Sequence, residues 1–281
     1  MVAWLVFLAL ALCPVVSSWA SGSEISDENT AINSCIGCHS ERLSVYVCNP
    51  AQVQEAQLRC VWCHRGNAAT SRVDLAHNNL IGKEYAGYRL RESEVFNTGV
   101  TWIERLACRR CHVLNKQGNL LTTNLDQLLS RASIGEIESA LAVPAFYMPI
   151  FALNDGVRQA VITQILAGGV EYAASQEDPP RVVHFADKLD HDSLFEKHCG
   201  ACHIVLTGRK GGLGVGVQGP NLSGLLSKFY PANALNNQLW TAAGLSDWIK
   251  NPRKIRPLTT MPPLVLDDQV IKQLIEDTWS K

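Results

Sequence analysis

The sequence predicts a mostly α-helical protein with short helices, long loops and little or no sheet. Strand-like alternation of apolar and polar residues is scarce, and several stretches instead carry apolar residues at helical spacing. In addition, the pattern C-x-x-C-H occurs four times, and it places two cysteines about one helical turn apart. A chain of 281 residues is long enough for two domains or a few small ones.

The first 20 residues predict an export signal. Residues 2–16 are almost wholly apolar, and the small residues Ser18 and Ala20 fit a cleavage site after Ala20. No Lys or Arg precedes the apolar run, so retention of this segment as an N-terminal membrane anchor is the alternative. We expect a mature chain that is periplasmic or otherwise exported, and we assign Cys13 to the discarded signal.

Eight of the ten cysteines belong to the repeated pattern. They are Cys35, Cys38, Cys60, Cys63, Cys108, Cys111, Cys199 and Cys202. C-x-x-C-H is the attachment signature of c-type haem, because both thiols can reach the vinyl groups of one porphyrin from the same side. A zinc half-site, a thioredoxin-like pair or disulfides would not need a His after every cysteine pair. The sequence therefore predicts four covalently bound c-type haems, with the helices and loops wrapped around them.

The His that ends each motif is the expected proximal ligand of the haem iron. These residues are His39, His64, His112 and His203. Cys48 lies outside the motifs, and two interpretations are open for it. It is either a buried, inert residue or a thiolate ligand of the first or second haem.

Methionine placement predicts two distal ligands. Haem iron in electron-transfer sites usually has a second axial ligand, either His or Met. Apart from Met1, the methionines lie in the pairs Met148-Pro149 and Met261-Pro262, one after the third motif and one after the fourth. We expect Met148 and Met261 to bind the third and fourth irons, with core packing as the alternative.

Four segments follow one another near the C-terminus. They are Leu194–His203, Gly219–Leu222, Thr260–Pro263 and Asp267–Trp279. With them, residues 188–281 resemble the class I cytochrome c family. The resemblance implies, in order, a helix with the haem motif, a turn whose backbone carbonyl accepts a bond from the proximal His, a distal methionine loop and a closing helix.

A weaker resemblance to the same family covers residues 96–172. It implies a helix over 101–112, a distal loop at Pro144–Pro149 and a closing helix over 154–167 that Gly168-Gly169 ends. The Gly-Pro turn is missing here, and Thr123-Asn124-Leu125 stands in its approximate place.

The two N-terminal haems have no methionine left as a distal ligand. His77, which follows the second motif closely, is the expected distal ligand of one of them, with a hydrogen-bonded loop His as the alternative. His184 and His191 are candidates for the other iron, which otherwise lacks a distal ligand from the protein. His198 adjoins Cys199 and is assigned to the surface or to packing.

These motifs predict a signal peptide at 1–20, a dihaem module at 21–95, class I-like units at 96–172 and 188–281, and a linker at 173–187. Within this plan, Ser133–Glu136 fits a capping box and Pro50 can begin a helix that leads to the second motif. The glycine-rich stretch 208–219 predicts a flexible loop at a haem edge.

The sequence favours an electron carrier over an enzyme. We expect it to transfer electrons between a donor, either a cytochrome or a quinol-linked membrane oxidoreductase, and a downstream acceptor. A reductase or oxidase of a small anion such as nitrite, thiosulfate or selenite, acting at an open N-terminal haem, is the alternative. A net charge of -1 does not favour a nucleic-acid partner, and association with a membrane complex is a further option.

Overall fold

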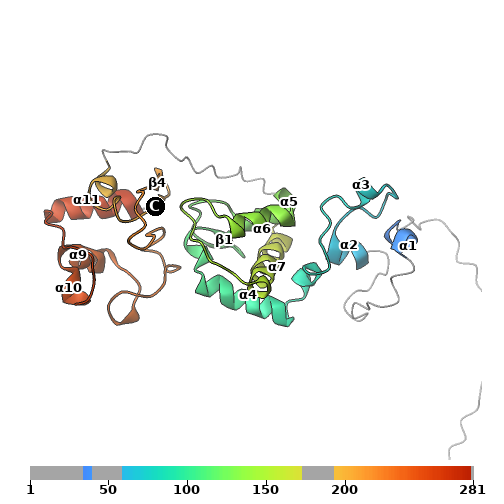
Figure 1. The fold of residues 1–281 in the computed structure, drawn as a ribbon, viewed down its shortest axis with the longest axis horizontal. Coiled ribbons are helices and arrows are strands. Elements are labelled where there is room, and N and C mark those ends of the chain that lie inside the picture. Colours follow the sequence, from blue (N-terminus) through green and yellow to red (C-terminus); the bar gives the residue numbers. More distant parts are fainter. Residues whose placement is uncertain (1–33, 40–58, 173–192, 280–281) are drawn as a thin grey trace, which may run out of the picture.

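The computed structural model describes residues 34–39, 59–172 and 193–279. Figure 1 shows three groups of elements that follow one another along the long axis in chain order. The predicted export signal, Cys48, the helix expected from Pro50, the linker and the two histidines His184 and His191 lie outside the described residues.

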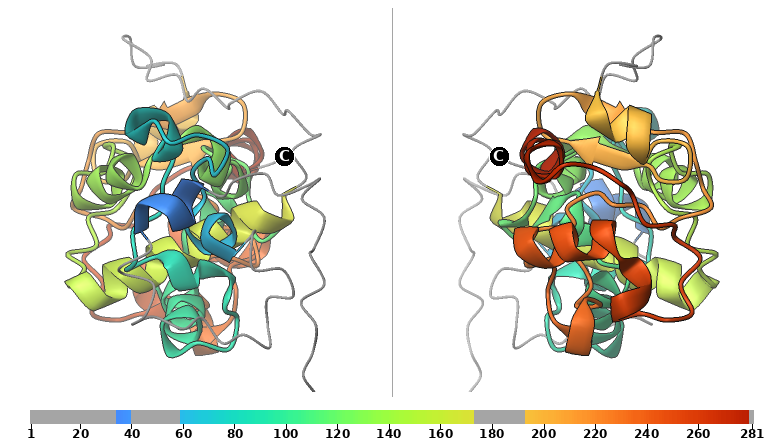
Figure 2. Two further views of the ribbon diagram at one scale, coloured as in Figure 1. Left: turned by 90° about the vertical axis from the view of Figure 1, so that its right-hand side faces the viewer. Right: turned by 90° about the vertical axis from the view of Figure 1, so that its left-hand side faces the viewer.

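The N-terminal group consists of short helices. They are α1 (Ser34–His39), α2 (Arg59–His64), α3 (Val73–Ala76) and the 3₁₀ helix η3 (Ala86–Arg89). The first two helices are the first two C-x-x-C-H motifs themselves. Seen from the ends of the long axis, α1 and α2 face one side and α9 to α11 face the other (Figure 2).

The middle group is built around the packing of α4 against α7. Its elements are α4 (Glu94–Arg105), η4 (Cys108–Arg110), β1 (Val113–Leu114), β2 (Gln117–Gly118), η5 (Leu125–Gln127), α5 (Leu128–Arg131), α6 (Ile134–Ala142) and α7 (Asp155–Glu171). Ile103 of α4 packs with Val161, Ile165 and other buried residues of α7. Tyr88 of η3 belongs to the same apolar cluster, so the N-terminal and middle groups share a core.

The C-terminal group has its own core. Its elements are α8 (Leu194–His198), β3 (Val205–Thr207), β4 (Gly211–Leu213), η6 (Leu235–Asn237), α9 (Ala242–Lys250), α10 (Pro252–Ile255) and α11 (Asp268–Trp279). Phe195 of α8 packs with Ile249 of α9 and with Ile271 and Leu274 of α11. The closing helix predicted over 267–279 is therefore confirmed, with its apolar face buried.

Two short antiparallel hairpins are the sheet structure of the described residues: β1 with β2, and β3 with β4. In the second, Val205 pairs with Leu213 and Thr207 with Gly211. The loop predicted over 208–219 is thus partly wrong, because residues 211–213 form strand β4 of this hairpin. The prediction of a helix-rich chain with short helices and little sheet is confirmed.

In the middle group one predicted helix boundary is confirmed and another is wrong. The capping box is confirmed, since Ser133 and Glu136 exchange hydrogen bonds at the start of α6. The closing helix, however, continues through Gly168 and Gly169 to Glu171. A side chain at either glycine would overlap neighbouring side chains, Asp126 at Gly168 and Leu129 at Gly169. These glycines therefore allow close packing of α7 and do not end it.

Among the residues that the structure describes, no helix has the length and apolar character needed to cross a membrane.

Candidate haem sites

All four motifs adopt one helical turn. Two of them lie on α-helices, and the other two form a turn that is closed by backbone hydrogen bonds. The first and second lie on α1 and α2. In the third, the Cys108 carbonyl accepts hydrogen bonds from the backbone N–H of Cys111 and of His112, at 3.2 and 3.0 Å. In the fourth, Cys199 accepts from Cys202 and His203 in the same way, at 3.0 and 2.9 Å. Both cysteines and the His of each motif therefore lie on one turn of chain.

The helix predicted over 101–112 is wrong at its C-terminal end. Helix α4 ends at Arg105, and Ala107 has a left-handed backbone with φ of 52°. The motif then begins on a new turn, η4, at Cys108. This break changes the direction of the chain between the core-packed face of α4 and the motif.

The third motif opens onto a cavity of about 490 Å³. Cys108, Cys111, His112 and Met148 all line it. Most of the other lining residues are apolar and come from α4, η5, α5, α6 and α7, among them Ile103, Leu125, Leu128, Ile137, Leu141, Val161 and Ile165. The volume lies within the range of about 300–1,000 Å³ that is usual for small-molecule and cofactor sites. The structure thus brings the predicted attachment, proximal and distal residues of the third site together.

The charge states in this cavity suit an apolar ligand. Burial raises the pKa of the Cys108 thiol to about 12, and it also raises the pKa of Cys111. Burial lowers the pKa of His112, which favours the neutral imidazole. Both thiols are free. Two neutral thiols and a neutral imidazole therefore face a space lined mostly by hydrocarbon.

Three of the proximal histidines are oriented by the same hydrogen bond. The Nδ1–H of His112 donates to the Thr123 carbonyl at 2.8 Å, that of His203 to Pro220 at 2.9 Å, and that of His64 to Ile81 at 2.8 Å. A carbonyl can only accept, so each ring carries its proton on Nδ1 and leaves Nε2 for a metal. The hydrogen bond predicted from His203 to the Gly-Pro turn is confirmed.

At the third site, the Thr123 carbonyl takes the role that the Gly-Pro turn has at the fourth site. Its carbonyl points to His112 from the loop before η5, where the Asn124 side chain accepts a hydrogen bond from the Asp126 backbone N–H at 3.0 Å. Asp126 is buried and accepts from two backbone N–H groups of the hairpin turn between β1 and β2, those of Asn115 and Lys116. Thr123 therefore fixes the His112 ring, and Asp126 fixes the hairpin turn that follows His112.

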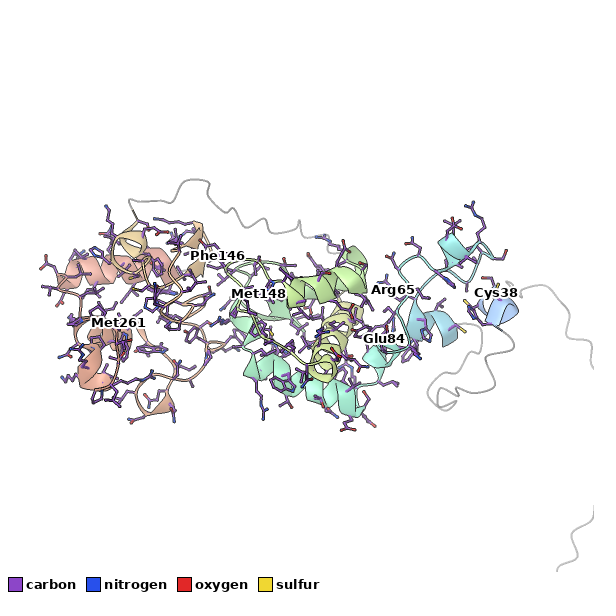
Figure 3. All side chains as sticks on the ribbon, in the orientation of Figure 1. Cys38, Arg65, Glu84, Phe146, Met148 and Met261 are labelled. Atoms are coloured by element: carbon purple, nitrogen blue, oxygen red, sulfur yellow. The ribbon has the colours of Figure 1, made fainter. Side chains whose placement is uncertain are left out.

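The fourth site has a donor to its methionine sulfur that the sequence analysis did not find. Met261 lies in the C-terminal group, as Figure 3 shows, and its Sδ accepts a hydrogen bond from Nε1 of Trp248 on α9 at 2.9 Å. Burial raises the pKa of Cys199 to about 12, whereas Cys202 is exposed. The pairing of Met261 with His203 on one iron stays a prediction.

In the N-terminal group, His77 lies beside the first motif. The ring centroids of His77 and His39 are 6.1 Å apart, and the ring planes are inclined by 32°. Cys38 marks this end of the molecule in Figure 3.

In the second motif, Trp62 lies between the two cysteines, and the Arg89 guanidinium lies 5.0 Å from its ring centroid. His198 is the last residue of α8.

The third and fourth sites meet at a contact between the middle and C-terminal groups. Asn221, which follows the carbonyl acceptor of His203, donates from Nδ2 to the Tyr147 carbonyl at 2.7 Å. The Tyr147 hydroxyl donates to the Gly214 carbonyl at 3.2 Å. Tyr147 also packs with Cys111, Ile204 and Leu206 in one small apolar cluster. The residue before Met148 and the residue after His203 are therefore both part of this contact.

Sequence reasoning missed the roles of Tyr147 and Trp248 and the backbone acceptors of His64 and His112. Their partners lie far along the chain: Tyr147 and Gly214 are separated by 67 positions. The position of Tyr147 directly before Met148 was the available signal. No protein-family model matches this chain, and no solved structure matches it.

Proposed function

We propose that this protein is an exported tetrahaem c-type cytochrome that transfers electrons between a donor, quinol-linked or cytochrome, and a downstream acceptor. The observation that carries the proposal is the cavity lined by Cys108, Cys111, His112 and Met148. A covalently bound haem would supply an iron that takes up and releases single electrons, with a reduction potential tuned by its protein ligands.

The chemistry of the cavity favours haem over zinc. A neutral thiol that adds across a vinyl group becomes an uncharged thioether, which an apolar cavity accommodates. A structural zinc site takes four ligands, and among the described residues no group of three or more His, Cys, Asp or Glu side chains is arranged to hold a metal ion. Met148 also lines the cavity, and a methionine thioether is a usual distal ligand of haem iron, which supports the proposal.

The residues of the other three motifs fit the same role. The Nδ1–H groups of His64, His112 and His203 each donate to a backbone carbonyl, which fixes the ring for binding through Nε2. In this proposal Met148 and Met261 are the distal ligands of the third and fourth sites, and His77 serves one N-terminal site. Met/His ligation raises the reduction potential, so the third and fourth sites are the high-potential end of the chain.

The order of the groups supports transfer along the molecule. The motifs follow one another along the long axis in Figure 1, and the third and fourth are joined through Tyr147 and Asn221. Electrons would enter near the low-potential N-terminal sites and leave near the C-terminal group. Redox partners at the two ends would be a membrane quinol oxidoreductase or small cytochromes.

The decisive experiment counts covalent haems in the mature protein, by mass spectrometry and by the pyridine haemochrome absorbance. We expect four haems, and three in Cys108→Ala/Cys111→Ala. His198→Ala, next to the fourth motif, is the matched control and retains four. Fewer than four adducts in the unaltered protein, or zinc in place of iron, would contradict the proposal.

A redox titration followed by absorbance tests the carrier role. Two higher and two lower potentials are expected, and the higher pair should respond to changes at Met148 and Met261. Four superimposed potentials would contradict the gradient. Turnover of nitrite, thiosulfate or selenite by the purified protein would favour the alternative, an enzyme.

A further inference from the structure

His39 and His77 come from separate segments and face one another in the N-terminal group. His39 is the last residue of α1, and His77 directly follows α3. Their ring centroids are 6.1 Å apart. Both side chains are exposed, so burial of apolar surface does not explain why the two rings approach.

The first motif is held against the segment that carries His77. Both the backbone N–H and the hydroxyl of Ser34, at the start of α1, donate to the Ala68 carbonyl, at 3.0 and 2.9 Å. Asn67, next to Ala68, donates from its backbone N–H to the Ala76 carbonyl at 2.9 Å. These bonds connect α1 to the residue directly before His77.

The same segment begins and ends at the second motif. The backbone N–H of Ile81 donates to the His64 carbonyl at 2.7 Å, and the His64 ring donates back to the Ile81 carbonyl at 2.8 Å. Residues 65–80 therefore form a loop that is closed at the proximal His of the second motif and presents His77 to the proximal His of the first.

The distance between the two rings fits a shared metal ion. Two imidazoles that bind one metal from opposite sides, through nitrogens about 2 Å from it, have ring centroids about 6 Å apart, because each nitrogen lies about 1 Å from its ring centre. An ordinary contact between two aromatic rings spans the same range, so the distance alone does not decide. The anchoring of both segments, and the place of His39 in a haem motif, favour the metal.

We propose that His77 is the distal ligand of the first haem, opposite His39, and not of the second. This assignment rests on the proposed function, because it requires a haem attached at Cys35 and Cys38. An imidazole that binds the first iron is not available to the second. The distal position opposite His64 is therefore filled from outside the 65–80 loop or is open to small ligands.

The first test is the spin state of the haem irons after His77 is removed. His77→Ala should convert one of the four haems from low spin to high spin, seen by paramagnetic resonance, and should add one equivalent of carbon monoxide binding to the wild-type value. Exogenous imidazole should restore the low-spin signal, which separates loss of a ligand from loss of folding. Asn78→Ala, the adjacent exposed residue, is the matched control and should change nothing.

To identify which haem His77 binds, His77→Ala is combined with the loss of one or the other N-terminal attachment site. The effect of His77→Ala should persist in Cys60→Ala/Cys63→Ala, where the second haem is not attached, and should vanish in Cys35→Ala/Cys38→Ala. The reverse pattern, or four low-spin haems in His77→Ala, would overturn this inference and leave the proposed function intact. Fewer than four haems in the unaltered protein would overturn the proposed function itself.

Gly66→Ala provides an independent route to the same result. Gly66 has φ of 76°, and a side chain there would overlap the Ala76 carbonyl, directly before His77. This substitution shifts the loop without removing the ligand. We expect partial conversion of the same haem to high spin, and a change confined to another haem would count against the assignment.

Discussion

The middle and C-terminal groups place equivalent parts in the same order with different residues. Each has a short turn with the cysteines and His, a two-stranded hairpin, a backbone carbonyl that accepts from the His, a Met-Pro pair and a closing helix. In the C-terminal group the carbonyl belongs to Pro220, and in the middle group it belongs to Thr123. The comparison shows that the hydrogen bond to the proximal His depends on the position of the backbone and not on a Gly-Pro sequence.

The two groups differ more in what surrounds the methionine. Met148 lines an apolar cavity within the middle core, and its neighbour Tyr147 contacts the C-terminal group. Met261 instead accepts a hydrogen bond from Trp248. Four pairs of variants test whether these differences have the consequences that we infer.

The largest effect is expected from removal of the attachment cysteines. Cys108→Ala/Cys111→Ala and Cys199→Ala/Cys202→Ala should each lose one haem. The first pair should lower the free energy of unfolding more, by at least about 3 kcal/mol, because it leaves an empty apolar cavity inside the middle core. Chemical denaturation of both variants checks this, and equal losses of stability would contradict the difference between the groups.

The next largest effect is expected from substitution of the two predicted distal methionines. Met148→His and Met261→His should each lower one reduction potential by on the order of 0.1–0.3 V, within the span of about 0.8 V that axial ligands control. A spectroscopic redox titration measures the shift. If Met148→His leaves all potentials unchanged, Met148 is a packing residue and its proposed role as a distal ligand is wrong.

A smaller effect is expected at the carbonyl acceptors. A side chain at Gly219 would overlap the His203 ring, so Gly219→Ala should destabilise the fourth site by about 1–3 kcal/mol and shift its spectrum. Thr123→Ala is the matched change at the third site. It should have no effect on that spectrum, because the backbone carbonyl stays in place. A clear effect of Thr123→Ala would show that the side chain matters and would weaken the comparison.

The smallest effect is expected from the loss of the hydrogen bond to the Met261 sulfur, as a shift in reduction potential. A hydrogen bond from Trp248 withdraws electron density from Met261 and so favours the reduced iron. Trp248→Phe removes a bond of about 1 kcal/mol, which corresponds to a potential lower by about 40 mV. Trp240→Phe is the control, since its indole donates to Asn233. A shift of equal size in both variants would assign the effect to general packing.

Local sequence was sufficient wherever a feature depends on neighbouring residues. The capping box at Ser133 and Glu136 follows this rule, because its partners are three positions apart. The closing helix of the C-terminal group does so as well, since its apolar residues recur at helical spacing. The end of α7 was predicted wrongly because a glycine pair usually stops a helix, whereas here the tertiary contacts of Gly168 and Gly169 require small residues.

The sequence by itself determined the four motifs and the predictions of haem number and of proximal histidines, because covalent attachment needs fixed residue types at fixed spacing within five positions. Tertiary structure decided which parts meet. It brought Met148 to Cys108 and Cys111, Thr123 to His112, His77 to His39 and Trp248 to Met261. Met148 was predicted from its place in the sequence, whereas the contacts of Thr123 and Trp248 depend on a backbone carbonyl and on the packing of α9, which leave no signature in residue identity.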